Sequence, residues 1–140
     1  MDSWLAQYVE VLEGLNGDNL YTLSNLTSDK VSFRDPFNDI HTQKDFIAIM
    51  DDMFQRLTYV HFEVHRTLQQ EQEAFIYWSF YGNSRITGEF TFDGVSRIEA
   101  DEQGKVTLHH DFWDASELMQ KIPLLGGIIG KIRCKLNHNA

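Results

Sequence analysis

The spacing of apolar residues divides the chain into a helical first part and a strand-rich second part. Residues 2–16 carry apolar side chains every three or four positions, which predicts an amphipathic helix, and a shorter helix is expected over 18–26. A third helix is predicted over 42–57, because Thr42 and Asp45 have the spacing of a capping box. The apolar stripe of this third helix comprises Phe46, Ile47, Met50, Met53, Phe54 and Leu57.

The period then changes to two, which is the alternation of a β-strand. Strands are predicted at 30–35, 59–68, 74–81, 86–99 and 105–113. In the second of these, alternation puts Val60, Phe62, Val64 and Leu68 on one face. Four consecutive long strands after the helices predict an α+β fold with an antiparallel meander.

The strand over 74–81 is apolar on nearly both faces, which is typical of a central strand covered on both sides. Its outward-facing aromatic residues would be Phe75, Tyr77 and Tyr81. Such a patch is costly when exposed in a monomer, so the sequence predicts a homodimer.

Composition restricts the class of protein. The length of 140 residues and the 42% hydrophobic content suit one domain over 1–140 with a single core. The net charge of −9 repels phosphate backbones, so we expect no nucleic-acid partner. A single cysteine, Cys134, fits a reducing compartment. The first residues do not have the pattern of a signal peptide, and we therefore expect a cytoplasmic protein.

The C-terminal region, 115–136, is predicted to be a helical tail interrupted at Pro123. Its sequence from Ile122 to Arg133 is apolar and then basic. Such a segment can touch anionic lipid. We favour the alternative, in which the tail docks on its own domain as a lid or an edge cover, and we do not expect a membrane partner.

Several segments together carry a resemblance to a known family. They are Tyr8, Asn16-Gly17-Asp18, Phe33-Arg34-Asp35-Pro36-Phe37, Met53-Phe54 and His110-Asp111-Phe112-Trp113-Asp114. From about residue 4 to 135 the chain resembles the nuclear-transport-factor-2-like superfamily, and in particular its SnoaL-like branch. The superfamily includes ketosteroid isomerases, polyketide cyclases, limonene epoxide hydrolases and scytalone dehydratases. The resemblance implies a cone-like, cystatin-like fold in which helices and a strongly curved antiparallel sheet enclose a pocket. It does not specify a reaction.

The resemblance to ketosteroid isomerases implies two catalytic candidates. Asp35 matches the position of their general base, and Tyr8 matches their oxyanion-stabilising tyrosine. The position of their second oxyanion donor falls near Val95-Ser96, where this chain has no carboxylate. A structural alternative exists for each candidate: Asp35 can bond the amides of a turn, and Tyr8 can be a core residue with a bonded hydroxyl.

A second pair of candidates lies on the last strand. Asp111 matches the acid used there by cyclases and epoxide hydrolases, and alternation puts His109 and Trp113 on the same face. His109 and Asp111 could form an acid/base couple. Asp111 could instead be a buried carboxylate paired with an arginine, for which Arg34 and Arg97 are the candidates.

The arginine and second aspartate of the epoxide hydrolases align with Trp78 and Phe80. Neither side chain can polarise an epoxide, so that mechanism is disfavoured. The same residues make the pocket aromatic, which suits a small hydrophobic or aromatic molecule. The predicted ligand-binding residues are Phe33, Phe37, Met50, Phe54, Ile76, Trp78, Phe80 and Trp113.

We expect no metal and no organic cofactor. His61-x-Glu63-x-His65 puts three possible ligands on one strand face, but strand spacing separates them by roughly 6–7 Å. No glycine motif that would cradle a phosphate is present. Two functions stay open: isomerase or cyclase chemistry by proton transfer, and a non-catalytic module for ligand binding or dimerisation.

Overall fold

The computed structural model describes residues 3–123 and 125–138. Its helices are α1 (Trp4–Gly14), α2 (Tyr21–Leu26), α3 (Gln43–Arg56), α4 (Ala115–Met119) and α5 (Leu125–Leu136). Its strands are β1 (Thr27–Arg34), β2 (Asp39–Ile40), β3 (Tyr59–Gln70), β4 (Glu73–Ser84), β5 (Gly88–Ala100) and β6 (Val106–Trp113). Each predicted helix and strand is present, and the short strand β2 is an addition.

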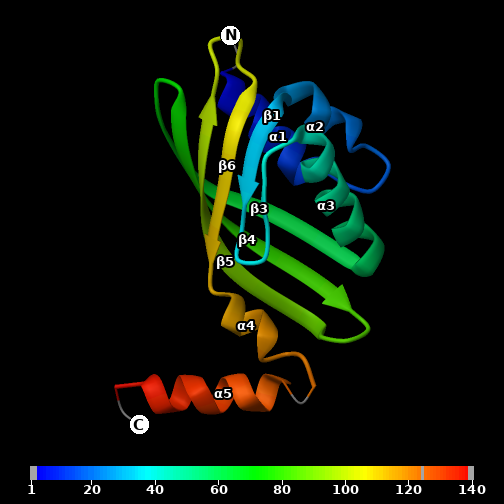
Figure 1. Cartoon of the computed structure of the whole chain (residues 1–140), viewed down its shortest axis with the longest axis vertical. Helices are drawn as coiled ribbons and strands as arrows, with labels where there is room; N and C mark the ends of the chain where they lie inside the picture. Colours follow the sequence, from blue (N-terminus) through cyan, green and yellow to red (C-terminus); the bar gives the residue numbers. More distant parts are fainter. Residues whose placement is uncertain (1–2, 124, 139–140) are drawn as a thin grey trace.

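The strands form one curved sheet of six, in the order β2-β1-β6-β5-β4-β3 (Figure 1). The predicted meander is present, because β3 to β6 pair consecutively and antiparallel. One pairing differs from a purely antiparallel sheet: β1 lies parallel to β6. The sheet therefore joins the N-terminal region to the last strand, and α1 and α3 lie against its ends, on β3 and β1.

Local signals fix where the helices begin. The Ser3 hydroxyl accepts from the backbone N–H of Ala6 at 3.1 Å, and the Thr42 hydroxyl accepts from that of Asp45 at 3.1 Å. Each bond satisfies a backbone donor that the first helical turn leaves unpaired. The predicted start of the third helix at Thr42 is thus confirmed.

An irregularity in β3 corrects one prediction of the sequence analysis. Val64 lies opposite Trp78, but Arg66 lies opposite Tyr77, so β3 holds one extra residue between them. Such a bulge reverses the alternation beyond it. Leu68 therefore lies opposite Phe75 and is exposed, whereas it was predicted to share a face with Val64.

The sheet has a buried face and an open face. Ala74, Ile76 and Trp78 point into the core, whereas Phe75 and Tyr77 are exposed, as alternation predicts. On the open face, Tyr77, Val95 and Phe112 lie side by side across three strands, and all three are exposed. The homodimer stays a prediction for this surface.

The C-terminal helices extend beyond the sheet (Figure 1). Helix α4 contacts β5, and α5 contacts α4. None of the described residues after Trp113 lines the main pocket. Helix α5 contains no buried residue, and Cys134 on it is exposed. Within the described residues, no helix has the length and apolar character needed to cross a membrane.

Candidate active site

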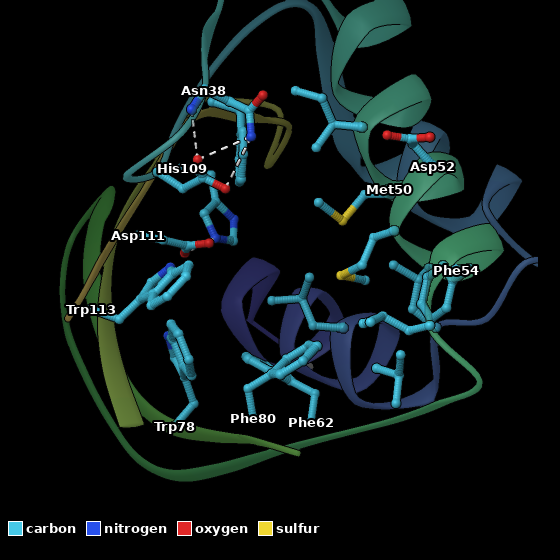
Figure 2. A pocket seen from close by; sticks show the side chains of 18 of the residues that line it. Asn38, Met50, Asp52, Phe54, Phe62, Trp78, Phe80, His109, Asp111 and Trp113 are labelled. Carbon is cyan, nitrogen blue, oxygen red and sulfur yellow. Dashed lines mark hydrogen bonds and ion pairs between the residues drawn. The ribbon is translucent and has the colours of Figure 1, made fainter. Parts of the chain in front are cut away.

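A cavity of about 470 Å³ lies between the inner face of the sheet and helices α1 and α3. Its sheet side is aromatic and is formed by Phe62, Trp78, Phe80, Phe92 and Trp113. Its helix side includes the apolar residues Leu12, Ile49, Met50, Met53 and Leu57, together with Phe46, Phe54 and the charged residues Glu13, Asp52 and Arg56. Figure 2 shows these two walls facing each other, with His109 and Asp111 at one end. The cavity has the size and lining of a site for a small, flat organic molecule.

The aromatic wall is held by stacking between neighbouring strands. The rings of Phe92 and Trp113 stack with centroids 4.0 Å apart, and Phe80 stacks on Phe92 at 5.2 Å. Trp78 adds a tilted contact with Phe62 at 5.3 Å. Such ring pairs fix the orientation of each side chain. The wall is therefore shaped before any ligand arrives.

Two buried chains of hydrogen bonds meet at the Asp111 carboxylate. Its Oδ1 atom is 2.6 Å from Nε2 of His109, and it also accepts a hydrogen bond from the Ser96 hydroxyl. The Ser96 oxygen accepts from the Trp78 indole N–H at 2.8 Å. On the other side, the Tyr8 hydroxyl is 2.7 Å from Nδ1 of His109. Four side chains from four elements thus orient one carboxylate.

Tyr8 and Asp111 bracket the imidazole of His109. Burial raises the pKa of the Tyr8 hydroxyl well above 10.0, and the negative charge of Asp111 adds to this rise, so the hydroxyl keeps its proton. The Asp111 carboxylate can only accept, so Nε2–H of His109 is the donor to Oδ1. In the tautomer with hydrogen on Nε2 alone, Nδ1 accepts a hydrogen bond from the Tyr8 hydroxyl.

The consequence is an asymmetric carboxylate. Every hydrogen bond that Asp111 makes to a described residue uses Oδ1. Oδ2 is left for the cavity, and the Asp111 side chain is 19% exposed, against 5% for His109. A carboxylate with one oxygen fixed and the other open to an apolar pocket can accept a proton from a bound molecule.

The predicted arginine alternative for Asp111 is wrong. Arg97 is on the outer face of the sheet, where its guanidinium bonds Glu73 at 2.8 Å and also Glu99. Arg34 is exposed, and neither arginine forms an ion pair with Asp111 in the described part of the chain. Asp111 therefore has hydrogen-bond donors as neighbours, and no permanent cation neutralises it.

Asp35 also lines the pocket, but its carboxylate is engaged by a turn. Oδ1 accepts from the backbone N–H of Phe37 at 2.8 Å and of Asn38 at 2.7 Å. The Asn38 side-chain amide lies 3.1 Å from Oδ1 and 3.3 Å from Oδ2. This geometry matches the structural alternative stated for Asp35 in the sequence analysis.

Two predicted site residues lie behind the pocket wall. Tyr8 and Ile76 are fully buried, and neither belongs to the cavity lining. Because the Tyr8 hydroxyl bonds His109, the direct contact with a ligand that was expected of it is not available. The other predicted residues line the cavity: Phe33, Phe37, Met50, Phe54, Trp78, Phe80, His109, Asp111 and Trp113.

Two residues of the site, Ser96 and Phe92, were not among those predicted from the sequence. Both lie on the inner face of β5, where Phe90, Phe92, Gly94 and Ser96 alternate with exposed residues. That alternation was a usable signal for Phe92. The bond from Ser96 to Asp111 depends on the register of β5 against β6, which sets the two residues directly opposite each other.

The structure gives no support for a metal site at His61, Glu63 and His65 on β3. His61 contacts Tyr81, and His65 is bonded to Ser79 at 2.7 Å. Over residues 3–123 and 125–138, no group of three or more His, Cys, Asp and Glu side chains is arranged to hold a metal ion.

Tyr8→Phe tests the buried chain. The change leaves Nδ1 of His109 buried without its donor, so we expect the free energy of unfolding to fall by about 1–3 kcal/mol near neutral pH. The wild-type protein should also lose stability as the pH rises above about 10, because the unfolded chain then releases the Tyr8 proton and the folded chain retains it. Urea unfolding at neutral and at high pH measures both effects.

The control for this experiment is Tyr59→Phe, which removes an exposed hydroxyl. It should leave both the neutral-pH stability and the loss at high pH close to the wild-type values. The Tyr8→Phe variant should lose less stability at high pH than the wild type. Equal losses in the two proteins would show that Tyr8 does not keep its proton in the folded state.

Comparison with known families gives one match by sequence. The model of a family described as a SnoaL-like domain matches residues 7–109. This range includes Tyr8, Asp35, Trp78 and His109, and it ends two residues before Asp111. A search of proteins with curated functions finds no match.

Solved structures of the same fold are numerous. A putative SnoaL-like polyketide cyclase from Shewanella denitrificans is 12% identical, with a TM-score of 0.71 over 84% of this chain and 93% of that chain. A hypothetical protein with a ketosteroid isomerase-like fold from Catenulispora acidiphila, in complex with trimethylamine, is 11% identical, with a TM-score of 0.72 over 86% of this chain and 92% of that chain. An epoxide hydrolase from M. tuberculosis, similar to the limonene enzymes, is 13% identical, with a TM-score of 0.68 over 92% and 89%. At these identities the likeness establishes the fold alone.

Proposed function

This chain belongs to the SnoaL-like domain family, and on that premise we propose that it catalyses cofactor-independent proton transfer on a small, flat organic molecule. The observation that carries the proposal is the Asp111 carboxylate, held at Oδ1 by His109 and Ser96 at the end of an aromatic pocket. The substrate we propose is an aromatic or bicyclic ketone with an acidic C–H next to its carbonyl.

The proposed reaction moves one proton and changes no oxidation state. Oδ2 of Asp111 takes the proton from the carbon next to the carbonyl, and the C–H electron pair moves into a C=C bond as the carbonyl becomes an enolate. The neutral carboxylic acid then returns a proton to the same carbon or to a conjugated carbon. Return to a conjugated carbon is isomerisation. Return to the same carbon is exchange when the acid has first replaced its proton with one from solvent, which is deuterium in deuterated buffer.

A donor for the enolate oxygen is present beside Asp111. Trp113 lies next to Asp111 at the same end of the cavity (Figure 2). The indole N–H of Trp113 makes none of the hydrogen bonds found among the described residues, and it is not among their buried unpaired groups. We assign this N–H to the enolate oxygen, since a preorganised donor favours the charge that develops there. His109 and Tyr8 act as positioning residues.

The rival function is binding without catalysis. It is favoured by the engagement of Asp35 in a turn, because the position that matches the general base of the ketosteroid isomerases is then occupied by hydrogen bonds to backbone amides. The trimethylamine complex of the Catenulispora protein shows that a protein of this fold can hold a small organic amine. An aromatic wall with one carboxylate also suits an organic cation.

Deuterium exchange separates the two functions. The wild-type protein is incubated in deuterated buffer with β-tetralone, a bicyclic ketone with acidic C–H groups, and the label is followed by NMR. We expect exchange faster than in buffer alone, and saturation as the ketone concentration rises. Saturable quenching of tryptophan fluorescence without exchange would instead support the binding module. If neither exchange nor quenching is observed, that result counts against the proposed pocket for such molecules.

A further inference from the structure

Charge is unevenly distributed along this chain. All 21 acidic residues occur at or before Glu117, together with eight of the 12 basic residues. The remaining four basic residues, Lys121, Lys131, Arg133 and Lys135, follow Glu117 with no acidic residue among them. The C-terminal segment is therefore a cationic end on a strongly acidic domain.

Helix α5 turns a glycine face toward Gln120, the residue at the end of α4. A Cβ atom at Gly126 would lie 2.1 Å from the backbone oxygen of Gln120, and one at Gly130 would lie 3.4 Å from its side-chain amide. Arg133, one turn further along the same face, donates to Oε1 of Gln120 at 2.6 Å. The absence of side chains at the two glycines permits this close approach. The orientation of α5 about its own axis is thereby set.

The apolar face of α5 points elsewhere. Leu125, Ile128, Ile129, Ile132 and Leu136 recur at helical spacing and form one stripe. Ile128 is 58% exposed, Ile132 48% and Leu136 82%. Lys131 and Lys135 border this stripe, since each follows one of its isoleucines by three positions. Neither lysine takes part in an ion pair within the part of the chain that the structure describes.

We propose that α5 is a membrane-surface helix, which attaches the protein to bilayers that contain anionic lipid. The aliphatic stripe would enter the boundary between headgroups and acyl chains, and Lys131 and Lys135 would reach the phosphate groups beside it. The inference is independent of the reaction proposed for the pocket. It reverses the expectation from sequence that this tail covers its own domain, because Ile128, Ile132 and Leu136 are exposed while Leu125 and Ile129 are half-buried.

Charge and placement favour lipid over a second copy of the chain. The acidic groups beside the exposed sheet row of Tyr77, Val95 and Phe112 are already engaged: Asp93 accepts from Tyr77 and Ser79, and Glu99 is paired with Arg97. They are therefore poor partners for the two lysines. The helix also lies beyond the end of the sheet, joined to it through α4 (Figure 1). This placement separates the acidic domain from the anionic lipid. Repulsion between the two is screened at separations beyond about 8–10 Å at physiological salt.

The test is co-sedimentation of the full chain with vesicles. One set contains phosphatidylcholine alone, and the other contains equal parts of phosphatidylcholine and phosphatidylglycerol. We expect binding to the second set only, and weaker binding as salt is raised. Replacing Ile128 and Ile132 together with asparagine should lower the partition coefficient by roughly tenfold or more, since it removes the centre of the apolar stripe. Lys131→Gln and Lys135→Gln should each lower it by about fivefold.

Matched controls use exposed residues elsewhere. Ile86→Asn changes an exposed isoleucine in the turn before β5, and Lys30→Gln neutralises an exposed lysine on β1. Both should bind like the wild type. Equal binding to the two vesicle sets, or undiminished binding by the double isoleucine variant, would overturn the proposal. A third outcome would also overturn it: the wild type does not bind anionic vesicles, and light scattering shows the double variant to be a smaller assembly than the wild type. Helix α5 would then be a contact between copies of the chain.

Discussion

Replacing Asp111 with asparagine is expected to lower the rate of deuterium exchange into β-tetralone by roughly 10²–10⁴-fold. The amide cannot accept a proton from carbon, although its oxygen can still accept the hydrogen bonds of Ser96 and His109. The fold and the affinity for the ketone should therefore persist. The measurements are the exchange rate at saturating ketone and the concentration that gives half of it.

Asp35→Asn is the matched control, because it makes the same chemical change in another aspartate that lines the pocket. The Asp35 carboxylate is bonded to the amides of its own turn, so this variant should keep its exchange rate within a fewfold of the wild type. Thermal unfolding checks that both variants are folded. A large loss of exchange in Asp35→Asn, with a small one in Asp111→Asn, would move the catalytic role to Asp35.

Gly94→Ala is expected to have a large effect on stability. A Cβ atom at this position would lie 2.4 Å from Cη2 of Trp78 and 3.0 Å from the backbone oxygen of Phe112. Trp78 is buried between neighbouring rings and bonded to Ser96, so it has little room to move. We expect the free energy of unfolding to fall by about 1–3 kcal/mol, as for other overpacked sites, measured by denaturant unfolding.

A double-mutant cycle shows whether Trp78 causes this loss. The two closest atoms belong to the six-membered ring of the indole, which phenylalanine places differently. In a Trp78→Phe background, Gly94→Ala should therefore cost less than in the wild type. Gly14→Ala is the control, because nothing lies within 4 Å of its added Cβ. The same cost in both backgrounds would assign the clash to the Phe112 backbone.

Much of the fold was predictable because it depends on local patterns. The capping residue Thr42 and the alternation of β6 concern neighbours in the chain, and alternation alone put His109, Asp111 and Trp113 on one face. The family resemblance added the curvature and the pocket. Gly94 makes room for a tryptophan on the adjacent strand, which the pattern along its own strand does not reveal.

The remaining features depend on contacts between distant segments. The bond between Tyr8 and His109 joins residues 101 positions apart, and the bond from Ser96 to Asp111 needs an exact strand register. Ile76 has the inward orientation that alternation predicts, but its depth below the pocket floor is set by packing. No glycine or proline marks the bulge after Val64 in the sequence, so the exposed position of Leu68 could not be predicted.

A crystal structure with β-naphthol tests the central claim most directly, since this planar phenol resembles the enol of β-tetralone. We predict that its rings lie between the aromatic wall at Trp78 and Trp113 and the helix side at Met50. Its hydroxyl should lie within hydrogen-bond distance of Asp111 or of the Trp113 indole N–H. A naphthol bound with its hydroxyl at the pocket mouth and its rings away from Asp111, or bound outside this cavity, would contradict the assignment.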